Sequence, residues 1–146
     1  ETLRERLGIA VITPHPRELS RLCGQSVTEI QESRIATVRR LSQEWNVVLL
    51  LKGAYTVIGS PDAKIFINPT GNSALATAGS GDVLSGFIGG FLAQGLSPLN
   101  ATLAGAYLHG LAADCFIQKT ESNYMVASDL FEGLRLAINA VKPQKN

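Results

Sequence analysis

The chain has 146 residues, 45% of them hydrophobic, which is enough for one domain with a sizeable core. Its 13 basic and 12 acidic residues leave a formal net charge of +1. A charge so close to zero gives no electrostatic case for a protein that binds nucleic acid or an anionic membrane surface. The dense basic pair Arg39–Arg40 is expected on the solvated outer face of a helix.

The cysteines and the N-terminal residues indicate a cytoplasmic protein. Cys23 and Cys115 are far apart and fit neither a C-x-x-C pattern nor a metal-ligand spacing, as is typical of buried thiols in an intracellular protein. Residues 1–6 are charged, unlike a signal peptide. The longest apolar run, 47–51, is too short to cross a bilayer. We therefore expect no membrane partner.

A strand followed by two helices is predicted at the start of the chain. Residues 8–13 form a short apolar run that ends at a proline, as a buried strand does. Pro16 suits the first turn of a helix, and Gly24 suits its end. Thr28 and Gln31 match a capping box, which predicts the start of a second helix. The predicted core-facing stripe of this helix is Ile35, Val38, Leu41 and Trp45.

The unbroken apolar run 47–51 is typical of a central strand that is covered on both faces. A helix followed by such a strand is the second half of a βαβ unit, which indicates a layered α/β fold. Two short strands are predicted at 55–58 and 65–67, on either side of a turn. Three helices then follow a loop of small residues, the first to about Gly95, the second from Ser97 to about Lys119, and the third from Ser128 through Ile138.

The helices that close the chain contain many glycines. Small residues let helices approach closely, so we interpret most of these glycines as packing positions rather than ligand contacts. They are Gly86, Gly89, Gly90, Gly105 and Gly110.

Asp82 lies where a glycine-rich loop passes into an apolar helix. The N-terminus of a helix favours anions, because its first N–H groups are free and the dipole is positive there. Asp82 is then either a carboxylate that stabilises the first helical turn or a general base beside an anion bound by the N–H groups of residues 79–81. The loop lacks the lysine of a Walker A motif and the spacing of a dinucleotide fingerprint.

Two further segments are predicted at the same edge of the sheet. Lys52 follows the central strand, and His15 follows the first strand between two prolines. Ligands of open α/β sheets bind at the carboxyl ends of the strands, so both side chains are candidates for a site. His109 is predicted within a helix among apolar residues, where a satisfied core histidine is the simpler interpretation.

These segments together resemble one enzyme family. They are Thr13-Pro14-His15-Pro16-Arg17-Glu18, Leu51-Lys52-Gly53, and the run 71–86 that contains Ala78-Gly79-Ser80-Gly81-Asp82. In this order and spacing they closely resemble the ADP/ATP-dependent NAD(P)H-hydrate dehydratases of the ribokinase-like superfamily. Residues 107–114 and 127–130 resemble the closing helices of that family, so the resemblance covers nearly the whole chain.

The resemblance implies a ribokinase-like three-layer α/β/α fold with a mostly parallel sheet flanked by helices. Residues 1–146 would form a single domain that is the C-terminal part of the family's domain. It also implies a repair enzyme that removes water from 6-hydroxylated NADH or NADPH, driven by hydrolysis of ADP or ATP. The C6 hydroxyl would be phosphorylated and phosphate then eliminated, with Mg²⁺ bridging the phosphates.

The resemblance also assigns roles to residues. Asp82 would be the base that faces the C6 hydroxyl of the substrate, and His15 would contact the hydrated dinucleotide. No residue is assigned as a protein ligand of a metal. The residues implied for the nucleotide and its phosphates are Lys52, Gly53, Ala54, Tyr55, Thr56, Gly79, Ser80 and Gly81.

The chain departs from the family pattern at two positions. Ala78 stands where the family loop has glycine, and it fits only if its φ is negative. Arg17 replaces the glycine of Thr-Pro-His-Pro-Gly-Glu at a helix start, where glycine has no evident role. Neither departure removes a proposed catalytic group.

The length of the chain suggests a part of a larger protein. Early βα units that complete the sheet and one wall of the substrate pocket would precede residue 1, and an epimerase domain fused before them is possible in this family. Without those units a strand edge would be exposed, so we expect the isolated segment to be poorly stable or inactive. The natural protein is expected to be a homo-oligomer.

Two other functions remain open on the sequence. One is a ribokinase-like vitamin or sugar kinase, which would use the same Gly-x-Gly-Asp arrangement and release a stable phosphate ester. The other is a non-catalytic nucleotide-binding module that has kept the fold.

Overall fold

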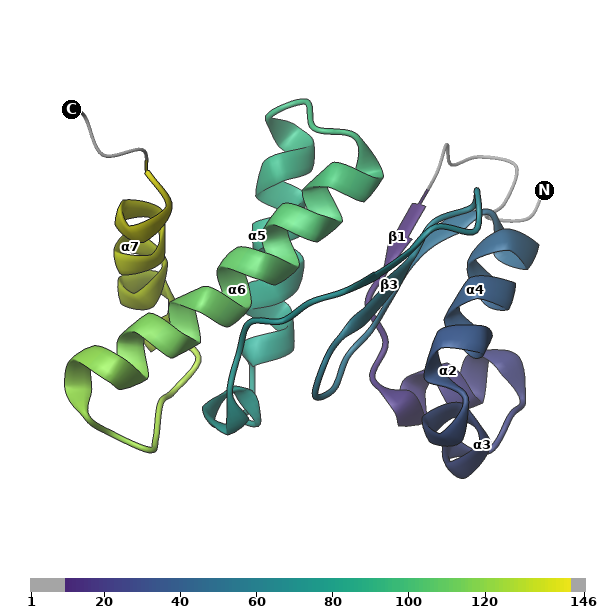
Figure 1. The fold of residues 1–146 in the computed structure, drawn as a ribbon, viewed down its shortest axis with the longest axis horizontal. Helices are drawn as coiled ribbons and strands as arrows, with labels where there is room; N and C mark the ends of the chain where they lie inside the picture. Colours follow the sequence, from purple (N-terminus) through teal and green to yellow (C-terminus); the bar gives the residue numbers. More distant parts are fainter. Residues whose placement is uncertain (1–9, 143–146) are drawn as a thin grey trace.

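The computed structural model describes residues 10–142, which form three layers around a central sheet. Helices α2, α3 and α4 cover one face of the sheet, and α5 and α6 cover the other (Figure 1). Helix α7 lies beyond α6, away from the sheet (Figure 1). The predicted three-layer α/β/α fold is therefore confirmed. Residues 8 and 9 of the predicted first strand lie outside the described residues.

The sheet has four strands in the order β1-β2-β3-β4. Strand β1 (Ala10–Ile12) pairs with β2 (Val47–Leu51) in parallel, which confirms the βαβ unit. Strand β3 (Val57–Gly59) is antiparallel to β2, and β4 (Ile65–Ile67) is antiparallel to β3. The prediction of a mostly parallel sheet is wrong for these residues. The connection 52–56 is too short for the crossover that a parallel neighbour of β2 needs.

Strand β2 is covered on both faces, as its apolar run predicts. Leu49 and Leu51 face α2, α3 and α4, while Val48 and Leu50 face α5 and α6. This alternation follows from the two-residue period of a strand. All four side chains are essentially inaccessible to solvent.

The first two helices after β1 are capped at both ends. Helix α2 (Pro16–Cys23) begins at the N-cap His15 and ends at Gly24, which has φ +76°. The predicted Pro16 start and Gly24 stop are thus confirmed. The next helix, α3 (Val27–Glu32), begins two residues earlier than predicted, because the capping box joins Ser26 and Glu29 rather than Thr28 and Gln31.

A break at Ser33 separates α3 from α4 (Arg34–Trp45), so the predicted single helix is in fact two. Ser33 has φ −129° and ψ 35°, outside the helical region. Val38 and Leu41 are buried as predicted and Trp45 packs at the edge of the same core, but Ile35 is 42% exposed. The break turns α4 relative to α3 and places Arg34 in its first turn.

Three helices complete the fold: α5 (Ser80–Ala93), α6 (Pro98–Thr120) and α7 (Asp129–Val141). A short 3₁₀ turn, η1 (Ser73–Leu75), precedes α5. The predicted N-cap of α6 is confirmed, since the Ser97 hydroxyl accepts a hydrogen bond from the Asn100 N–H at 3.3 Å. Within residues 10–142, none of the helices has both the length and the apolar character that crossing a bilayer requires.

The glycines of these helices serve different purposes. A Cβ on Gly110 would lie 2.2 Å from Thr70 Oγ1, and a Cβ on Gly105 would lie 2.6 Å from Ile88 Cγ1. These two allow close packing, as predicted. Nothing lies within 4 Å of the corresponding positions on Gly86, Gly89 and Gly90. The packing interpretation is therefore wrong for these three within the described residues.

Candidate active site

The carboxyl ends of β1 and β2 meet at one edge of the sheet, because the two strands are parallel. The chain continues from β1 into Thr13–His15 and from β2 into Lys52. The Lys52 N–H donates to the Pro14 carbonyl oxygen at 2.9 Å and so joins the two segments. The hydroxyls of Thr13 and Ser85 lie 3.4 Å apart, which places the first turns of α5 at the same edge.

His15 caps helix α2 as well as facing the predicted site. Its Nδ1 accepts a hydrogen bond from the Glu18 N–H at 3.1 Å, so in this tautomer the ring proton lies on Nε2. Nε2 lies 3.3 Å from Glu18 Oε1. The Glu18 carboxylate in turn accepts the His15 backbone N–H at 2.7 Å, which completes a capping box. The ring orientation is thus fixed by helix capping.

Glu18 links His15 to Lys52. Its Oε2 lies 3.5 Å from Lys52 Nζ, so one carboxylate contacts the side chains of both candidates. The hydrogen bond from the His15 N–H and the nearby Lys52 charge lower the pKa of Glu18. Glu18 is a site residue that our sequence reasoning did not single out. Its capping-box spacing after the first strand was the available signal.

Lys52 also contacts the glycine loop. A Cβ built on Gly81 would lie 3.2 Å from Lys52 Nζ, so the ammonium group packs against the backbone at the start of α5. The sequence places Lys52 and Gly81 far apart, and the fold brings them together. A lysine beside the positive end of a helix dipole is a suitable environment for an anion.

A residue in the left-handed backbone conformation joins the glycine loop to α5. Gly79 is the N-cap of α5 and has φ +85°, a conformation that suits glycine. The φ of Ala78 is not positive. Alanine therefore fits at this position, where the family loop has glycine. Asp82 lies in the first turn of α5, as expected of a carboxylate that stabilises the helix start, and its exposed side chain is open to a ligand.

The N–H groups of the loop are only partly free. The Ser80 N–H donates to the Thr77 carbonyl oxygen at 3.3 Å, and the Ser80 hydroxyl donates to the Leu75 carbonyl oxygen at 2.7 Å. Gly81 is the second residue of α5, where helix geometry provides no acceptor for the N–H. The Gly81 N–H is therefore the better placed donor for an anion beside Lys52.

His109 supports the glycine loop from behind. Its side chain is 8% exposed, and its Nε2 donates to the Ser80 carbonyl oxygen at 2.9 Å. The ring of Phe87 meets the His109 ring edge-on at 6.0 Å between centroids. Burial lowers the pKa of His109, which keeps the ring neutral. The prediction of a satisfied core histidine is confirmed.

Asp114 fixes the segment that leads into the loop. Its two carboxylate oxygens accept hydrogen bonds from the Gly71 N–H and the Asn72 side-chain amide, both at 2.8 Å. About two turns earlier in α6, the Thr70 hydroxyl donates to the Tyr107 carbonyl oxygen at 2.9 Å. Residues 68–72 are thereby held against α6, and Gly110 leaves room for this close approach.

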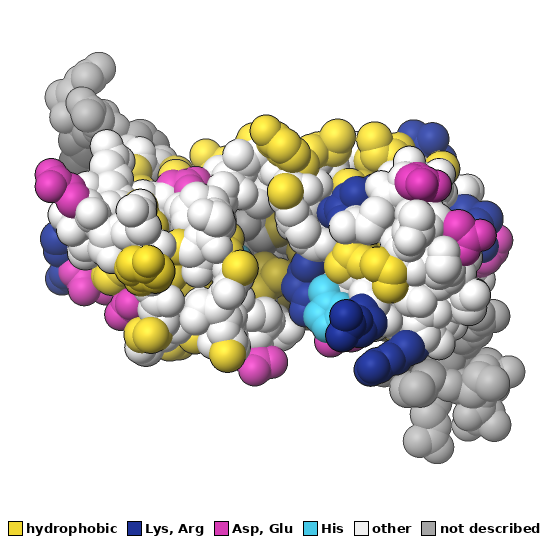
Figure 2. Space-filling view, turned by 90° about the horizontal axis from the view of Figure 1, so that it is seen from below, with side chains coloured by type: hydrophobic (Ala, Val, Ile, Leu, Met, Phe, Trp, Pro, Cys, Tyr) yellow, Lys and Arg dark blue, Asp and Glu magenta, His cyan; other side chains and the backbone are white. Residues whose placement is uncertain are grey.

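These elements enclose a cavity of about 550 Å³. Its walls are the turn 52–56, the segment 68–73, the start of α5, and the middle of α6 including His109. Lys and Arg side chains gather around a histidine beside a hollow on this side of the molecule (Figure 2). The predicted site residues that line the cavity are Lys52, Gly53, Ala54, Tyr55, Thr56, Ser80 and Gly81.

Three predicted site residues do not line this cavity: His15, Gly79 and Asp82. His15 and Asp82 have exposed side chains, so they are accessible to a ligand that extends beyond the cavity. The segment 68–73 lines the cavity although we assigned it no site residue. Its Asn, Pro, Thr and Gly residues form a loop next to the glycine loop, and this position was the only signal in the sequence.

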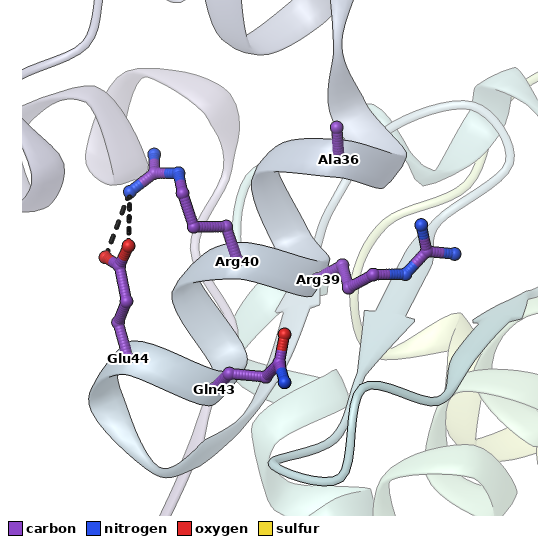
Figure 3. Close-up of a pocket in the computed structure, with 5 residues that line it drawn as sticks. All are labelled: Ala36, Arg39, Arg40, Gln43 and Glu44. Atoms are coloured by element: carbon purple, nitrogen blue, oxygen red, sulfur yellow. Dashed lines mark hydrogen bonds and ion pairs between the residues drawn. The ribbon is translucent and has the colours of Figure 1, made fainter.

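A second hollow lies on the outer face of α4, between Ala36, Arg39, Arg40, Gln43 and Glu44 (Figure 3). Arg40 donates to both carboxylate oxygens of Glu44, at 3.0 and 3.2 Å. Arg39 and Arg40 are exposed, which confirms the predicted solvated face. No predicted site residue lies here.

The fold and the site define an α/β protein that holds a cavity between strand ends and the N-terminus of a glycine-led helix. The family model for NAD(P)H-hydrate dehydratase matches residues 2–135. The chain therefore belongs to the NAD(P)H-hydrate dehydratase family, as its motifs predicted.

Similar proteins agree with this assignment. A bifunctional NAD(P)H-hydrate repair enzyme from Moorella thermoacetica is 50% identical over 87% of this chain and 24% of its own length. An ADP-dependent (S)-NAD(P)H-hydrate dehydratase from Neisseria meningitidis is 50% identical over 71% of this chain and 35% of its own length. The crystal structure of a Bacillus subtilis ADP/ATP-dependent NAD(P)H-hydrate dehydratase, co-crystallised with ATP and Mg²⁺, aligns with a TM-score of 0.86 at 35% identity.

The alignment with the Bacillus subtilis structure covers 97% of this chain and 51% of that one. The chain thus spans about half of the solved relative and smaller shares of the two curated relatives.

Proposed function

We propose that the natural protein containing this chain restores NADH or NADPH from its 6-hydroxylated form by removing water, coupled to hydrolysis of ADP or ATP. The observation that carries the proposal is the position of Lys52. Its ammonium group packs against Gly81 at the start of α5, on the wall of a cavity of about 550 Å³. That volume lies within the range of small-molecule sites, about 300–1,000 Å³.

The cavity suits a nucleotide whose phosphates lie at its cationic end. The turn 52–56 and the segment 68–73 would hold the nucleotide, and Lys52 with the Gly81 N–H would bind phosphate oxygens. This arrangement directs the terminal phosphate towards the first turn of α5, where Asp82 is exposed. The phosphoryl acceptor would therefore approach from the Asp82 side.

The chemistry follows from that geometry. Asp82 accepts the proton of the C6 hydroxyl while the hydroxyl oxygen attacks the terminal phosphorus and the nucleotide leaves. The C6–O bond then breaks, phosphate departs with the bonding electrons, and loss of a proton from the adjacent ring carbon restores the double bond of the dihydronicotinamide. His15, exposed at the same edge, would contact the part of the dinucleotide outside the cavity.

Magnesium fits this site as an ion that enters with the phosphates. Mg²⁺ is usually bound through one or two carboxylates together with phosphate oxygens and water. Residues 10–142 contain no group of three His, Cys, Asp or Glu side chains that could hold a metal ion. Asp82 is a single exposed carboxylate beside the proposed phosphate position. Bound with the phosphates, the ion would be held by phosphate oxygens and water and would neutralise their charge, while Asp82 stays free to act as the base.

The surroundings of this site also belong to the proposal. We infer that the chain is the C-terminal part of one ribokinase-like domain, since it spans about half of the solved relative. The relatives include bifunctional repair enzymes, so a fused epimerase domain before that domain fits the proposal. We also propose that the natural protein is cytoplasmic and forms a homo-oligomer.

The test is an assay of the full-length protein with hydrated NADH and either ADP or ATP. Recovery of dihydronicotinamide absorbance, with one phosphate released per turnover, supports the proposal. A competing kinase function would give a stable phosphate ester of a vitamin alcohol or sugar instead. Formation of such an ester without recovery of NADH would overturn the dehydratase assignment. Nucleotide binding with neither reaction would favour a non-catalytic module.

A further inference from the structure

Arg34 lies directly behind the turn that carries Lys52. It is the first residue of α4, next to the break at Ser33. A cation in the first turn of a helix is at the unfavourable end of the dipole, so helix stability alone does not explain an arginine there. Its guanidinium is half-buried, and burial lowers the pKa of Arg34.

The Arg34 guanidinium donates hydrogen bonds to main-chain carbonyl groups at the end of β2. Nη2 donates to the Leu51 carbonyl oxygen at 3.1 Å and to the Lys52 carbonyl oxygen at 3.4 Å. Nη1 lies 3.4 Å from the same Lys52 oxygen and donates to Gln31 Oε1 at 2.7 Å. The Arg34 guanidinium thus holds the carbonyl groups of Leu51, the last residue of β2, and of Lys52, the first residue of the turn 52–56.

Gly53 provides the space for this contact. A Cβ on Gly53 would lie 2.9 Å from Arg34 Nη1, so the missing side chain lets the guanidinium rest on the turn. Gly53 has φ +142° and Tyr55 has φ +53°, so the turn contains two unusual backbone conformations. Such conformations persist where the surroundings hold them.

Other contacts also hold the turn: the Asn68 N–H donates to the Thr56 carbonyl oxygen at 2.9 Å, and Glu18 Oε2 lies 3.5 Å from Lys52 Nζ. The Lys52 N–H donates to the Pro14 carbonyl oxygen, and the Thr56 hydroxyl donates to the Gly53 carbonyl oxygen at 3.1 Å. Arg34 differs from Glu18, which contacts only the Lys52 side chain, because its guanidinium bonds the main-chain carbonyl groups of Leu51 and Lys52. It does not line the cavity, whereas all five residues of the turn do.

We propose that Arg34 is a positioning residue of the nucleotide site, which acts through the Leu51 and Lys52 carbonyl groups and the space left by Gly53. It fixes the direction of the Lys52 side chain and the shape of the turn 52–56. This inference rests on the proposed function, because it takes the cavity beside Lys52 as the nucleotide site. Loss of the guanidinium should therefore weaken nucleotide binding even though Arg34 does not contact the nucleotide.

The test compares Arg34→Met with Arg39→Met in the full-length protein. Methionine keeps an unbranched apolar side chain and removes the hydrogen-bond donors. Arg39 lies on the same helix, exposed on its outer face, and serves as the control (Figure 3). The readouts are the dissociation constants of ADP and ATP with Mg²⁺, the nucleotide KM, kcat, and the unfolding midpoint.

Arg34→Met is expected to raise the nucleotide Kd and KM by about 10- to 100-fold, because small displacements of a binding group have effects of this order. Arg34→Lys, which keeps a cation and some donors, should restore part of the affinity. Arg39→Met should match the wild type. A lowered unfolding midpoint with unchanged Kd and KM would show a purely structural role and overturn the inference. If Arg34→Met does not fold, an unchanged Kd for Arg34→Lys overturns it.

The binding measurement separates this inference from the proposed function. A wild-type protein that binds nucleotide but does not restore NADH overturns the dehydratase proposal, and the Kd comparison still decides the role of Arg34. A wild-type protein that binds neither ADP nor ATP overturns both.

Discussion

Two features of Asp82 suit a general base: its position at the start of a helix and its exposed side chain. Its position in the first turn of α5 stabilises the negative charge through the helix dipole, and its exposed side chain stays open to a substrate hydroxyl. The residue can therefore act as soon as the phosphates occupy the neighbouring site.

Asp82→Asn should lower kcat by about 10²–10⁴-fold, the usual contribution of a general base. The exposed Asp82 carboxylate interacts with the helix dipole in the first turn, which is worth only about 0.3–1 kcal/mol, so folding and nucleotide binding should be retained. Turnover of hydrated NADH and the Kd for ADP are the measurements. Unchanged turnover would leave Asp82 only its capping role.

His109 should make stability depend on pH in a window where few other groups titrate. Burial lowers its pKa in the folded state below the value of about 6.5 that the group has in an unfolded chain. Below about 6.5 the unfolded state therefore binds more protons, so stability falls as the pH drops through that value towards the lower folded pKa. Above about pH 6.5, the contribution of His109 to the free energy of unfolding no longer changes with pH.

The measurement is the unfolding midpoint between about pH 5 and 8, above the ordinary titration range of the carboxylates. His109→Gln keeps an amide donor for the Ser80 carbonyl and should flatten the slope. The chain has two histidines, so His15→Gln, which retains His109, is the matched control. An equal slope in all three proteins would contradict the assignment.

At the scale of elements, the contact between α6 and the segment 68–72 shapes one wall of the cavity. It depends on Gly110, because a Cβ there would meet Thr70 Oγ1 at 2.2 Å and the Thr70 carbonyl carbon at 2.6 Å. The hydrogen bonds of Asp114 and Thr70 require the same close approach. The close packing at Gly110 and these hydrogen bonds therefore hold the segment 68–72 in the same position against α6.

Gly110→Ala should destabilise the full-length protein by about 1–3 kcal/mol, the usual cost of overpacking. It should also weaken nucleotide binding, since the displaced segment lines the cavity. Gln118→Ala, an exposed change on the same helix, should stay within about 0.5 kcal/mol of the wild type. Denaturant unfolding and ADP binding measure both effects, and an unperturbed Gly110→Ala would show that α6 moves away freely.

The elements also show what the sequence could and could not predict. Strand β2 and the start of α6 were predicted correctly, because an apolar run and a Ser-Pro cap are strong local signals. The capping box was misplaced because Ser26–Glu29 and Thr28–Gln31 both fit the pattern. The antiparallel hairpin could have been inferred from the short connection 52–56. The contact of Lys52 with Gly81 has no local signal, since it arises only from the packing of distant elements.

At the scale of the whole molecule, two open surfaces stand out within residues 10–142. Strand β1 pairs with β2 on one side and has no other neighbour in the sheet. Gly86, Gly89 and Gly90 form an exposed face of α5 with open space around them. Glycine within a helix costs roughly 0.5–1 kcal/mol relative to alanine, and these positions gain no packing in return. Both surfaces are consistent with a chain that spans about half of the solved relative.

We predict that residues 1–146 alone are poorly stable or inactive, whereas the full-length protein restores NADH. The physical reason is the unpaired edge of β1, whose free N–H and C=O groups favour pairing with another chain. Amide hydrogen exchange gives the sharpest comparison. The amides of β1 should exchange quickly in the isolated segment and slowly in the full-length protein, while those of β2, paired on both sides, should be better protected than β1 in both. A stable, monomeric segment with robust dehydratase activity would contradict the prediction, and it would place the complete site within these 146 residues.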